Sequence, residues 1–360
     1  MLPAKSMSSS SIDQKQRPGT PASQGYFQPA EWAPHEACWL AWPSDAELWE
    51  DHLEPAQEEF TALCRSIDER LEILVPDAAA RIQAEKALAG LSVRFHDMPF
   101  GDIWLRDTAP IFLTDDTQVS AACFRFNGWG EKYDLPYDDE VSLRIAKASG
   151  LPVFHSDWIL EGGSVDVDGE GTCLTSKQCL LNPNRNSEMT QAQIEEALRA
   201  SLGVKTVLWV NEGLLNDHTD GHIDTIARFV APGKVICMEA RDANDPNHRV
   251  LEHIAKDLAR MKDARGRQLE VIRIPSPGRV LSDDYAVMPA SFVNFYIANQ
   301  TVIVPTYGSP FDAEAVEGIA RCFPERKTVG LSAQAILNGG GAFHCITQQQ
   351  PAVRKPGAPK

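Results

Sequence analysis

The sequence of 360 residues lacks cysteine pairs at metal-ligand spacing, long apolar runs and an excess of basic residues. Its eight cysteines are scattered, so the sequence predicts neither a zinc framework nor a disulfide scaffold and favours a reducing compartment. Because no apolar run approaches the roughly 18 residues that a membrane span needs, we expect no membrane partner and a cytoplasmic location. Lys and Arg number 34 against 50 Asp and Glu, which gives a formal net charge of −16. This charge argues against nucleic acid as a partner and leaves cationic small molecules open, unless the acidity serves only solubility.

Two segments at the ends of the sequence differ in composition from the rest. Residues 1–28 are polar and rich in Ser, Pro and Gln, and residues 352–360 form a short basic stretch. A segment with so little apolar content cannot bury a core, so we expect a disordered N-terminal tail and a C-terminal tail. No Gly/Ser/Pro linker interrupts the remainder, which predicts a single folded domain over 29–351.

Between these tails one order of elements recurs. A pair of apolar strands split by a turn is followed by a helical segment and a further strand, about five times at a spacing of roughly 60 residues. The expected strand pairs cover 104–126, 163–181, 224–239 and 291–305. The expected helices cover 46–68, 77–91, 140–148, 190–202, 247–262 and 312–322, and the expected single strands cover 37–43, 71–76, 92–96, 152–155, 206–210, 269–274 and 327–331. This period predicts an α/β architecture of radially repeated hairpin-helix-strand units, because the alternative, a doubly wound parallel sheet, requires crossovers in place of hairpins.

Unusual polar residues gather at one position of each unit, just before the hairpin. They lie at 102–107, 161–163, 216–224 and 290–294, and a glycine-rich turn at 339–345 follows the last unit. Equivalent loops of a radial fold converge on one axis, so we expect these segments to meet in one central cleft.

The side chains expected in this cleft define a chemistry. Cys345 follows three consecutive glycines and is a candidate nucleophile, although free cysteine also serves as a small buried hydrophobe. His222 can activate the thiol, and Glu161 is available to orient the imidazole. Asp107 and Asp224 then remain as two carboxylates, which only accept hydrogen bonds and match the planar fork of a guanidinium.

Some of these patterns have simpler interpretations. The His-x-Asp spacing of His222 and Asp224 also fits half of a metal site, but no second His/Cys pair stands at ligand spacing, so we expect no metal. Arg106 and Asp107 also fit a surface ion pair, and Gly162–Gly163 also fits a plain turn.

Two lone histidines and three tryptophans are interpreted in the same way. His218 and His344 are more typical of structural or polar packing than of catalysis. Trp39 and Trp42 are typical of a core, whereas Trp104 is favoured for the site because it precedes Asp107 by three residues.

Taken together, several motifs resemble those of one known family. They are D-I-W-x-R-D at 102–107, E-G-G at 161–163, T-D-G-H-I-D at 219–224, A-R-F at 227–229, N-F-Y-I at 294–297 and G-G-G-x-x-H-C-I-T-Q-Q at 339–349. Over about 31–351 the chain resembles the bacterial peptidyl-arginine deiminase/agmatine deiminase family of guanidine-modifying enzymes. The resemblance implies the pentein fold, a five-bladed α/β propeller, and a deiminase with neither a metal nor an organic cofactor.

The resemblance also implies a role for each matching residue. Cys345 would attack the guanidinium carbon, and Asp107 and Asp224 would bind the guanidinium nitrogens. His222, oriented by Glu161, would protonate the departing ammonia and then activate water, so that a covalent amidino-cysteine is hydrolysed to a ureido product. For agmatine that product is N-carbamoylputrescine, a step of polyamine biosynthesis. We expect the substrate to be contacted by Trp104, His218, Asp220, Gly339 and Gly340.

At two positions the chain departs from the pattern usual in agmatine deiminases. His218 replaces an Asp that is a candidate for holding the distal amine, and Ala342 replaces an Asn. Free arginine and peptidyl arginine therefore remain alternative substrates, the former with Arg228 or Arg125 as partner of its carboxylate. The same motifs leave room for a transamidinase and for a non-catalytic binding propeller that tolerates Cys345→Ala, and assembly into a homo-oligomer stays open.

Overall fold

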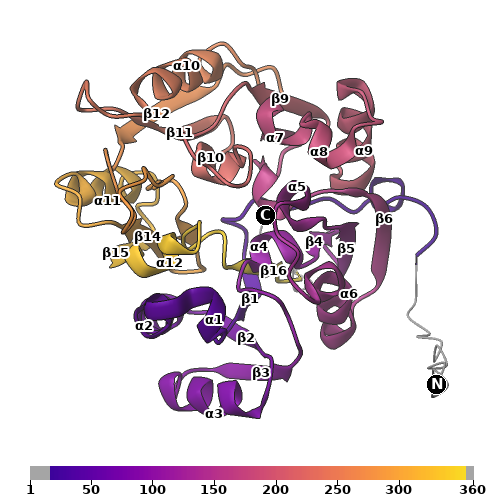
Figure 1. The fold of residues 1–360 in the computed structure, drawn as a ribbon. Helices are drawn as coiled ribbons and strands as arrows, with labels where there is room; N and C mark the ends of the chain where they lie inside the picture. Colours follow the sequence, from indigo (N-terminus) through magenta and orange to yellow (C-terminus); the bar gives the residue numbers. More distant parts are fainter. Residues whose placement is uncertain (1–16, 354–360) are drawn as a thin grey trace, which may run out of the picture.

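Five separate sheets organise the chain. The computed structural model describes residues 17–353, and these form one four-stranded sheet and four three-stranded sheets. Figure 1 shows the sheets following one another in chain order around the middle of the molecule, with the longer helices on the outside. Five separate sheets exclude the alternative of a doubly wound parallel sheet.

Each three-stranded sheet repeats one unit. β10 (Ala227–Ala231) and β11 (Lys234–Glu239) pair antiparallel, and α10 (His248–Leu258) then leads to β12 (Glu270–Pro275), which pairs parallel to β11. A tight turn can join only antiparallel strands, so the parallel neighbour needs the helical crossover. The other three units are β4 (Ile111–Thr114), β5 (Val119–Arg125), α6 (Asp138–Ser149) and β6 (Val153–Ile159); β7 (Val165–Val167), β8 (Thr172–Ser176), α9 (Gln191–Leu202) and β9 (Thr206–Val210); and β13 (Tyr296–Ile297), β14 (Thr301–Thr306), α11 (Asp312–Ala320) and β15 (Lys327–Ser332). The predicted order of hairpin, helix and strand is thereby confirmed.

The remaining sheet pairs the first strand of the described residues with the last. β1 (His35–Ala41), β2 (Arg70–Val75) and β3 (Val93–Asp97) pair parallel, with α2 (Leu53–Ser66) and α3 (Ala78–Ala87) as their crossovers. β16 (Gln348–Pro351) pairs antiparallel with β1 in the register Cys38↔Gln349. This strand was not predicted, and it places the chain just after Cys345 beside the first strand.

Several short elements differ from the expectation. The expected strand at 104–113 begins with a helical turn, α4 (Leu105–Thr108), and the expected helix at 46–68 is divided into α1 (Ala46–Trp49), a 3-10 turn (Glu50–His52) and α2. The division falls at Glu50, whose φ of 48° lies outside the helical region. The other short elements are η1 (Ala22–Gln24), α5 (Gly128–Glu131), η3 (Gly162–Ser164), α7 (Lys177–Leu180), α8 (Pro183–Asn186), η4 (Ile223–Thr225) and α12 (Gln334–Asn338).

The predicted N-terminal tail extends too far into the chain. Residues 1–16 lie outside the described residues, but Tyr26 is buried against Phe154, with their ring centroids 5.5 Å apart. Phe27 exchanges backbone hydrogen bonds with Thr114. These two aromatic residues anchor a segment whose average composition is polar. Of the predicted C-terminal tail, residues 354–360 lie outside the described residues as well. Within 17–353, no helix combines the length and apolar character that crossing a membrane requires.

Candidate active site

The polar segments converge at Gly163. A Cβ at Gly163 would stand 2.6 Å from His222 Nδ1, 2.9 Å from Asp107 Oδ1 and 3.0 Å from Asp224 Oδ2. These groups come from turns that precede three different sheets. Asp107 lies on α4, Gly163 on η3 and Asp224 on η4, each directly before a hairpin. The predicted convergence is thus observed, and only a residue without a side chain fits at its centre.

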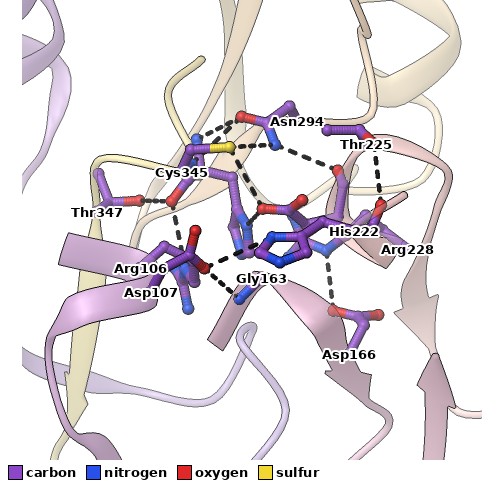
Figure 2. A network of polar contacts seen from close by, with 12 residues as sticks. Arg106, Asp107, Gly163, Asp166, His222, Thr225, Arg228, Asn294, Cys345 and Thr347 are labelled. Carbon is purple, nitrogen blue, oxygen red and sulfur yellow. Dashed lines mark hydrogen bonds and ion pairs between the residues drawn. The ribbon is translucent and has the colours of Figure 1, made fainter. Parts of the chain in front are cut away.

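Cys345 lies next to Asn294 in the site (Figure 2). Its Sγ accepts a hydrogen bond from Asn294 Nδ2 at 3.1 Å and lies 3.5 Å from Asp224 Oδ2. Burial and the charges of Asp224 and Asp107 raise the pKa of the thiol well above its ordinary value. Burial and these two charges therefore favour the thiol, and a cation bound between the carboxylates would shift the balance toward the thiolate.

His222 is fully buried beside Asp107. Its Nδ1 lies 3.6 Å from Asp107 Oδ1, and neither ring nitrogen has a hydrogen-bond partner among residues 17–353. Burial lowers the pKa of the imidazole, but Asp107, Cys179 and Glu161 outweigh it and raise the pKa well above its ordinary value. His222 is therefore available as a proton donor at neutral pH.

Glu161 lies near His222 without forming the expected hydrogen bond. Its Oε1 accepts a hydrogen bond from Arg185 Nε at 2.6 Å, and its Oε2 has no partner in the described part of the chain. Oxygen, sulfur and nitrogen atoms of Glu161, Cys179 and His222 lie within 4.8 Å of one another, a spacing that a metal could bridge. The positive charge of the Arg185 guanidinium beside these three residues disfavours the binding of a metal cation there. The expectation that no metal or cofactor takes part stays a prediction.

The two aspartates are held in different ways. Asp107 accepts hydrogen bonds from the Gly163 backbone N–H at 2.8 Å and from Trp129 Nε1 at 2.9 Å. Burial raises its pKa, with His222 acting in the opposite direction. Asp224 Oδ2 lies 2.8 Å from His344 Nδ1, while its Oδ1 has no partner within 17–353. Burial opposes ionisation of Asp224, but His344 and His222 outweigh it and lower its pKa. Asp224 is therefore favoured as a carboxylate, and its Oδ1 can accept a hydrogen bond from a ligand.

A buried charge network extends behind Asp224. His344 Nε2 lies 2.8 Å from Glu31 Oε2, which also accepts a hydrogen bond from Arg228 at 2.7 Å, and Arg228 Nε donates to Asp166 at 2.9 Å. His344 therefore connects Asp224 to this network through polar contacts. Arg228 has no exposed surface and is saturated by these partners, so the idea that it binds a substrate carboxylate is wrong.

A cavity of about 440 Å³ leads to this site. Cys345, Asp107 and Trp104 line it, and so do His218, Gly339 and Gly340, as expected. A Cβ at Gly341 would approach Trp104 to 2.7 Å and Cys345 Sγ to 3.1 Å, so the glycine turn keeps the space in front of the sulfur open.

Asp220 does not take part in this lining. Its carboxylate binds Lys132 Nζ at 2.6 Å and Arg185 at 2.8 Å, so the expectation that it contacts substrate is wrong. Its φ of 65° belongs to a tight turn that directs the side chain toward Arg185.

The cavity wall contains acidic side chains without Lys or Arg among the described residues. Five carboxylates line it, from Glu50, Asp102, Asp107, Asp283 and Asp284. Among the described residues, no Lys or Arg lines the cavity, and Arg125, the second candidate partner of a substrate carboxylate, is exposed elsewhere. The wall thus suits a ligand with positive charge at more than one place.

Known proteins share both the sequence and the fold. Residues 27–351 match the family described as Porphyromonas-type peptidyl-arginine deiminase. The agmatine deiminase of Stutzerimonas stutzeri is 40% identical over 359 residues, which covers 92% of this chain and 97% of that protein. The chain belongs to this deiminase family. The resemblance inferred from the motifs is thereby confirmed.

Solved structures of the family agree over nearly the whole chain. Agmatine deiminase of Enterococcus faecalis matches with a TM-score of 0.90 at 33% identity, covering 94% of this chain and 99% of that one. A cysteine-to-serine variant of C. jejuni agmatine deiminase with substrate bound matches with a TM-score of 0.83 at 27% identity, covering 92% and 97%. The deiminase family thus provides relatives in which substrate binding has been seen.

Two residues of the site were missed by the sequence reasoning. Asn294 lies in a noted motif, but a neutral amide gives no charge signal. Glu31 stands just after the predicted tail, and nothing in its neighbourhood marks it as buried. The segment 290–294 was expected in the cleft because it precedes a hairpin, but this expectation gave Asn294 no role of its own.

Proposed function

We propose that this chain hydrolyses agmatine to N-carbamoylputrescine and ammonia through a covalent intermediate on Cys345. The supporting observation is the combination of a thiol beside the buried carboxylate of Asp224 with a cavity wall of five carboxylates and, among the described residues, no Lys or Arg. Agmatine carries a guanidinium at one end and an ammonium at the other, and both ends suit this wall. The names of the relatives support the same substrate.

The first half of the reaction forms the intermediate. The guanidinium binds to Asp107 and to the free Oδ1 of Asp224, and its charge offsets theirs, so that the Cys345 proton is released to solvent. The thiolate attacks the guanidinium carbon and forms a C–S bond. A C–N bond then breaks as His222 gives its proton to the departing nitrogen, which leaves as ammonia.

The second half returns the enzyme to its starting state. Neutral His222 takes a proton from water, whose oxygen attacks the same carbon. The C–S bond breaks and the sulfur leaves as a thiolate, which takes a proton back from solvent. The hydroxyl proton is released to solvent, where the ammonia that left earlier becomes ammonium. The ureido product is neutral at the reacted end, so the two aspartates bind it less strongly than they bind the guanidinium.

We further propose that the five sheets are the blades of a pentein propeller with pseudo-fivefold symmetry. Four blades repeat the hairpin-helix-strand unit, and the fifth is completed by β16 from the C-terminal end. The ring of sheets in Figure 1 and the approach of three pre-hairpin turns to Gly163 support this arrangement. A cytoplasmic location and a role in polyamine synthesis are part of the same proposal.

Free arginine is the second candidate substrate, and the cavity disfavours it. Its α-carboxylate would enter a wall that carries carboxylates, and Arg228, which might have received it, is buried with Asp166 and Glu31. Like charges in a partly desolvated cavity repel, so we expect kcat/KM for arginine to be lower than for agmatine by at least about 100-fold.

Ammonia release from agmatine, free arginine and a blocked arginine peptide tests the function. The expected result is release from agmatine by the wild type and none above background by Cys345→Ser. Release only from arginine or the peptide would retain the mechanism and refute the substrate. Release from none of the three would refute the hydrolase and favour the binding propeller. Addition of an amine acceptor to the same assay tests for amidino transfer, which we expect to be absent.

A further inference from the structure

We propose that Asn294 is a catalytic residue whose side-chain amide donates a hydrogen bond to the Cys345 thiolate while it fixes the backbone of the nucleophile. The inference deepens the proposed function, on which its kinetic part rests. Asn294 is fully buried, and it comes from the segment before β13, on the side of the site opposite Gly163 in Figure 2.

The orientation of the amide follows from its backbone partners. Asn294 Oδ1 lies 3.1 Å from the His344 backbone nitrogen and 3.3 Å from that of Cys345. A backbone N–H can only donate, so the atom that faces both must be the amide oxygen. The amide nitrogen is then directed to Cys345 Sγ at 3.1 Å and to the Asp224 backbone carbonyl at 3.4 Å.

This geometry determines which hydrogen bond the Cys345 sulfur accepts. The NH2 group is a donor, so it pairs best with a sulfur that has lost its proton, and hydrogen bonds to a charged group are the stronger ones. The other groups facing the sulfur are Asp224 at 3.5 Å and the more distant Asp107, both anionic, which disfavour the thiolate. Hydrogen bonds from the Ala342 backbone and from Asn294 lower the pKa of Cys345 against burial and these charges.

The amide thus supplies a donor that acts on the reacting atom in both halves of the reaction. It stabilises the sulfur when the thiolate forms and again when the thiolate leaves carbon. No proton is transferred to or from Asn294. The same side chain holds two consecutive backbone N–H groups, so the sulfur and its donor are fixed as one unit.

Alkylation of Cys345 by iodoacetamide as a function of pH tests the inference without substrate. Peptide mapping separates Cys345 from the half-buried Cys322, which serves as an internal reference. For Asn294→Ala we expect the Cys345 profile to move to higher pH, with the rate at neutral pH falling about tenfold, as for loss of one hydrogen bond to a charged group. In Asn294→Asp one carboxylate oxygen can still accept from the two backbone N–H groups, but an anionic oxygen replaces the donor beside the sulfur. The profile should therefore move to higher pH at least as far as in Asn294→Ala.

Ser291→Ala is the matched control. Ser291 is buried in the same segment, donates to the Thr225 carbonyl at 2.7 Å and forms no hydrogen bond with Cys345. Its alkylation profile should equal that of the wild type. A wild-type profile in Asn294→Asp, or an equal shift in Ser291→Ala, would overturn the inference, because the effect would then be absent or would belong to the turn as a whole.

Turnover supplies the second readout. In both Asn294 variants kcat should fall about 10-fold to 100-fold, with a smaller change in KM, since the amide faces the sulfur rather than the cavity wall. If alkylation shifts as expected and the wild type fails to release ammonia from agmatine, the proposed function is wrong and the role of Asn294 at the sulfur stands. If agmatine is hydrolysed and the alkylation profiles are unchanged, the role of Asn294 is wrong and the proposed function stands.

Discussion

At the scale of single residues, the site depends on close approach of buried charged groups. Gly163 lies where His222, Asp107 and Asp224 meet, and its backbone N–H also donates to Asp107. Glycine is therefore required at position 163 by the close approach of these side chains, and not by the conformation of a turn.

Gly163→Ala tests this directly. The added methyl group would stand 2.6 Å from His222 Nδ1, inside van der Waals contact, so the imidazole or the aspartates must move. Displacement of about 1 Å commonly costs about 100-fold in rate, and we expect at least that loss in kcat/KM for agmatine. Thermal unfolding measured alongside separates loss of geometry from loss of fold. Wild-type kinetics in Gly163→Ala would contradict the placement.

The pH dependence of kcat follows from His222. Its pKa in the folded protein is raised, so the imidazolium that protonates the leaving nitrogen persists at neutral pH and is lost only as the pH rises through the folded pKa. We therefore expect the alkaline limb of kcat to lie above about 6.5, the ordinary value for histidine. Measurement of kcat for agmatine across the pH range checks this. A limb at or below the ordinary value would show that the surrounding carboxylates do not hold the proton.

The reacting groups could be predicted from the sequence better than the residues that form hydrogen bonds and ion pairs with them. Cys345, His222, Asp107 and Asp224 stand in motifs whose residue types point to guanidine chemistry, and the structure brings them together. The partners of Asp220 and Glu161 could not be predicted, because Arg185 lies far from both in the sequence and carries no motif. His344 was interpreted as structural or polar packing, and only the fold reveals that its polar partners are Asp224 and Glu31.

At the scale of elements, the short turns before the hairpins carry the site. α4, η3 and η4 contain four, three and three residues, too few to show a helical period in the sequence. The expected strands therefore began too early at 104, 163 and 224. β16 was missed for a similar reason, because its four residues include three glutamines and show no apolar alternation.

Truncation tests the role of β16. A chain ending after Thr347 loses the antiparallel partner of β1 and the Gln348 and Gln349 side chains that accept hydrogen bonds from Arg106. We expect loss of activity and a lower unfolding temperature, because buried Arg106 would lose partners. A chain ending after Pro351 retains β16 and is the matched control. Equal stability and activity of the two chains would contradict the role given to this strand.

At the scale of the whole molecule, the first and the last segments of the described residues both contribute to the site. Glu31 reaches the buried network from the N-terminal side, and β16 follows Cys345 into the first sheet. The repeated order of elements could be predicted because hairpins and crossovers differ in turn length. The extent of the N-terminal tail could not, because average composition hides two anchoring aromatic residues.

Tyr26 is the residue with which to test the N-terminal segment. It packs against Phe154 in the smaller of the two apolar clusters. Tyr26→Ala should lower the free energy of unfolding by about 3 kcal/mol, as is typical for removal of a buried aromatic ring. Chemical denaturation measures this change. A chain lacking residues 1–28 should likewise unfold at a lower temperature than a chain lacking residues 1–16, and equal stability of the two would show that 17–28 contributes nothing.

The central claim is that Cys345 forms a covalent intermediate with the guanidinium carbon of agmatine. Rapid acid quenching during turnover, followed by mass spectrometry of the Cys345 peptide, tests this most directly. The account predicts a transient increase on that peptide equal to the mass of agmatine less ammonia, absent in Cys345→Ser. Ammonia release at the wild-type rate by Cys345→Ser, or an adduct on another cysteine alone, would contradict it.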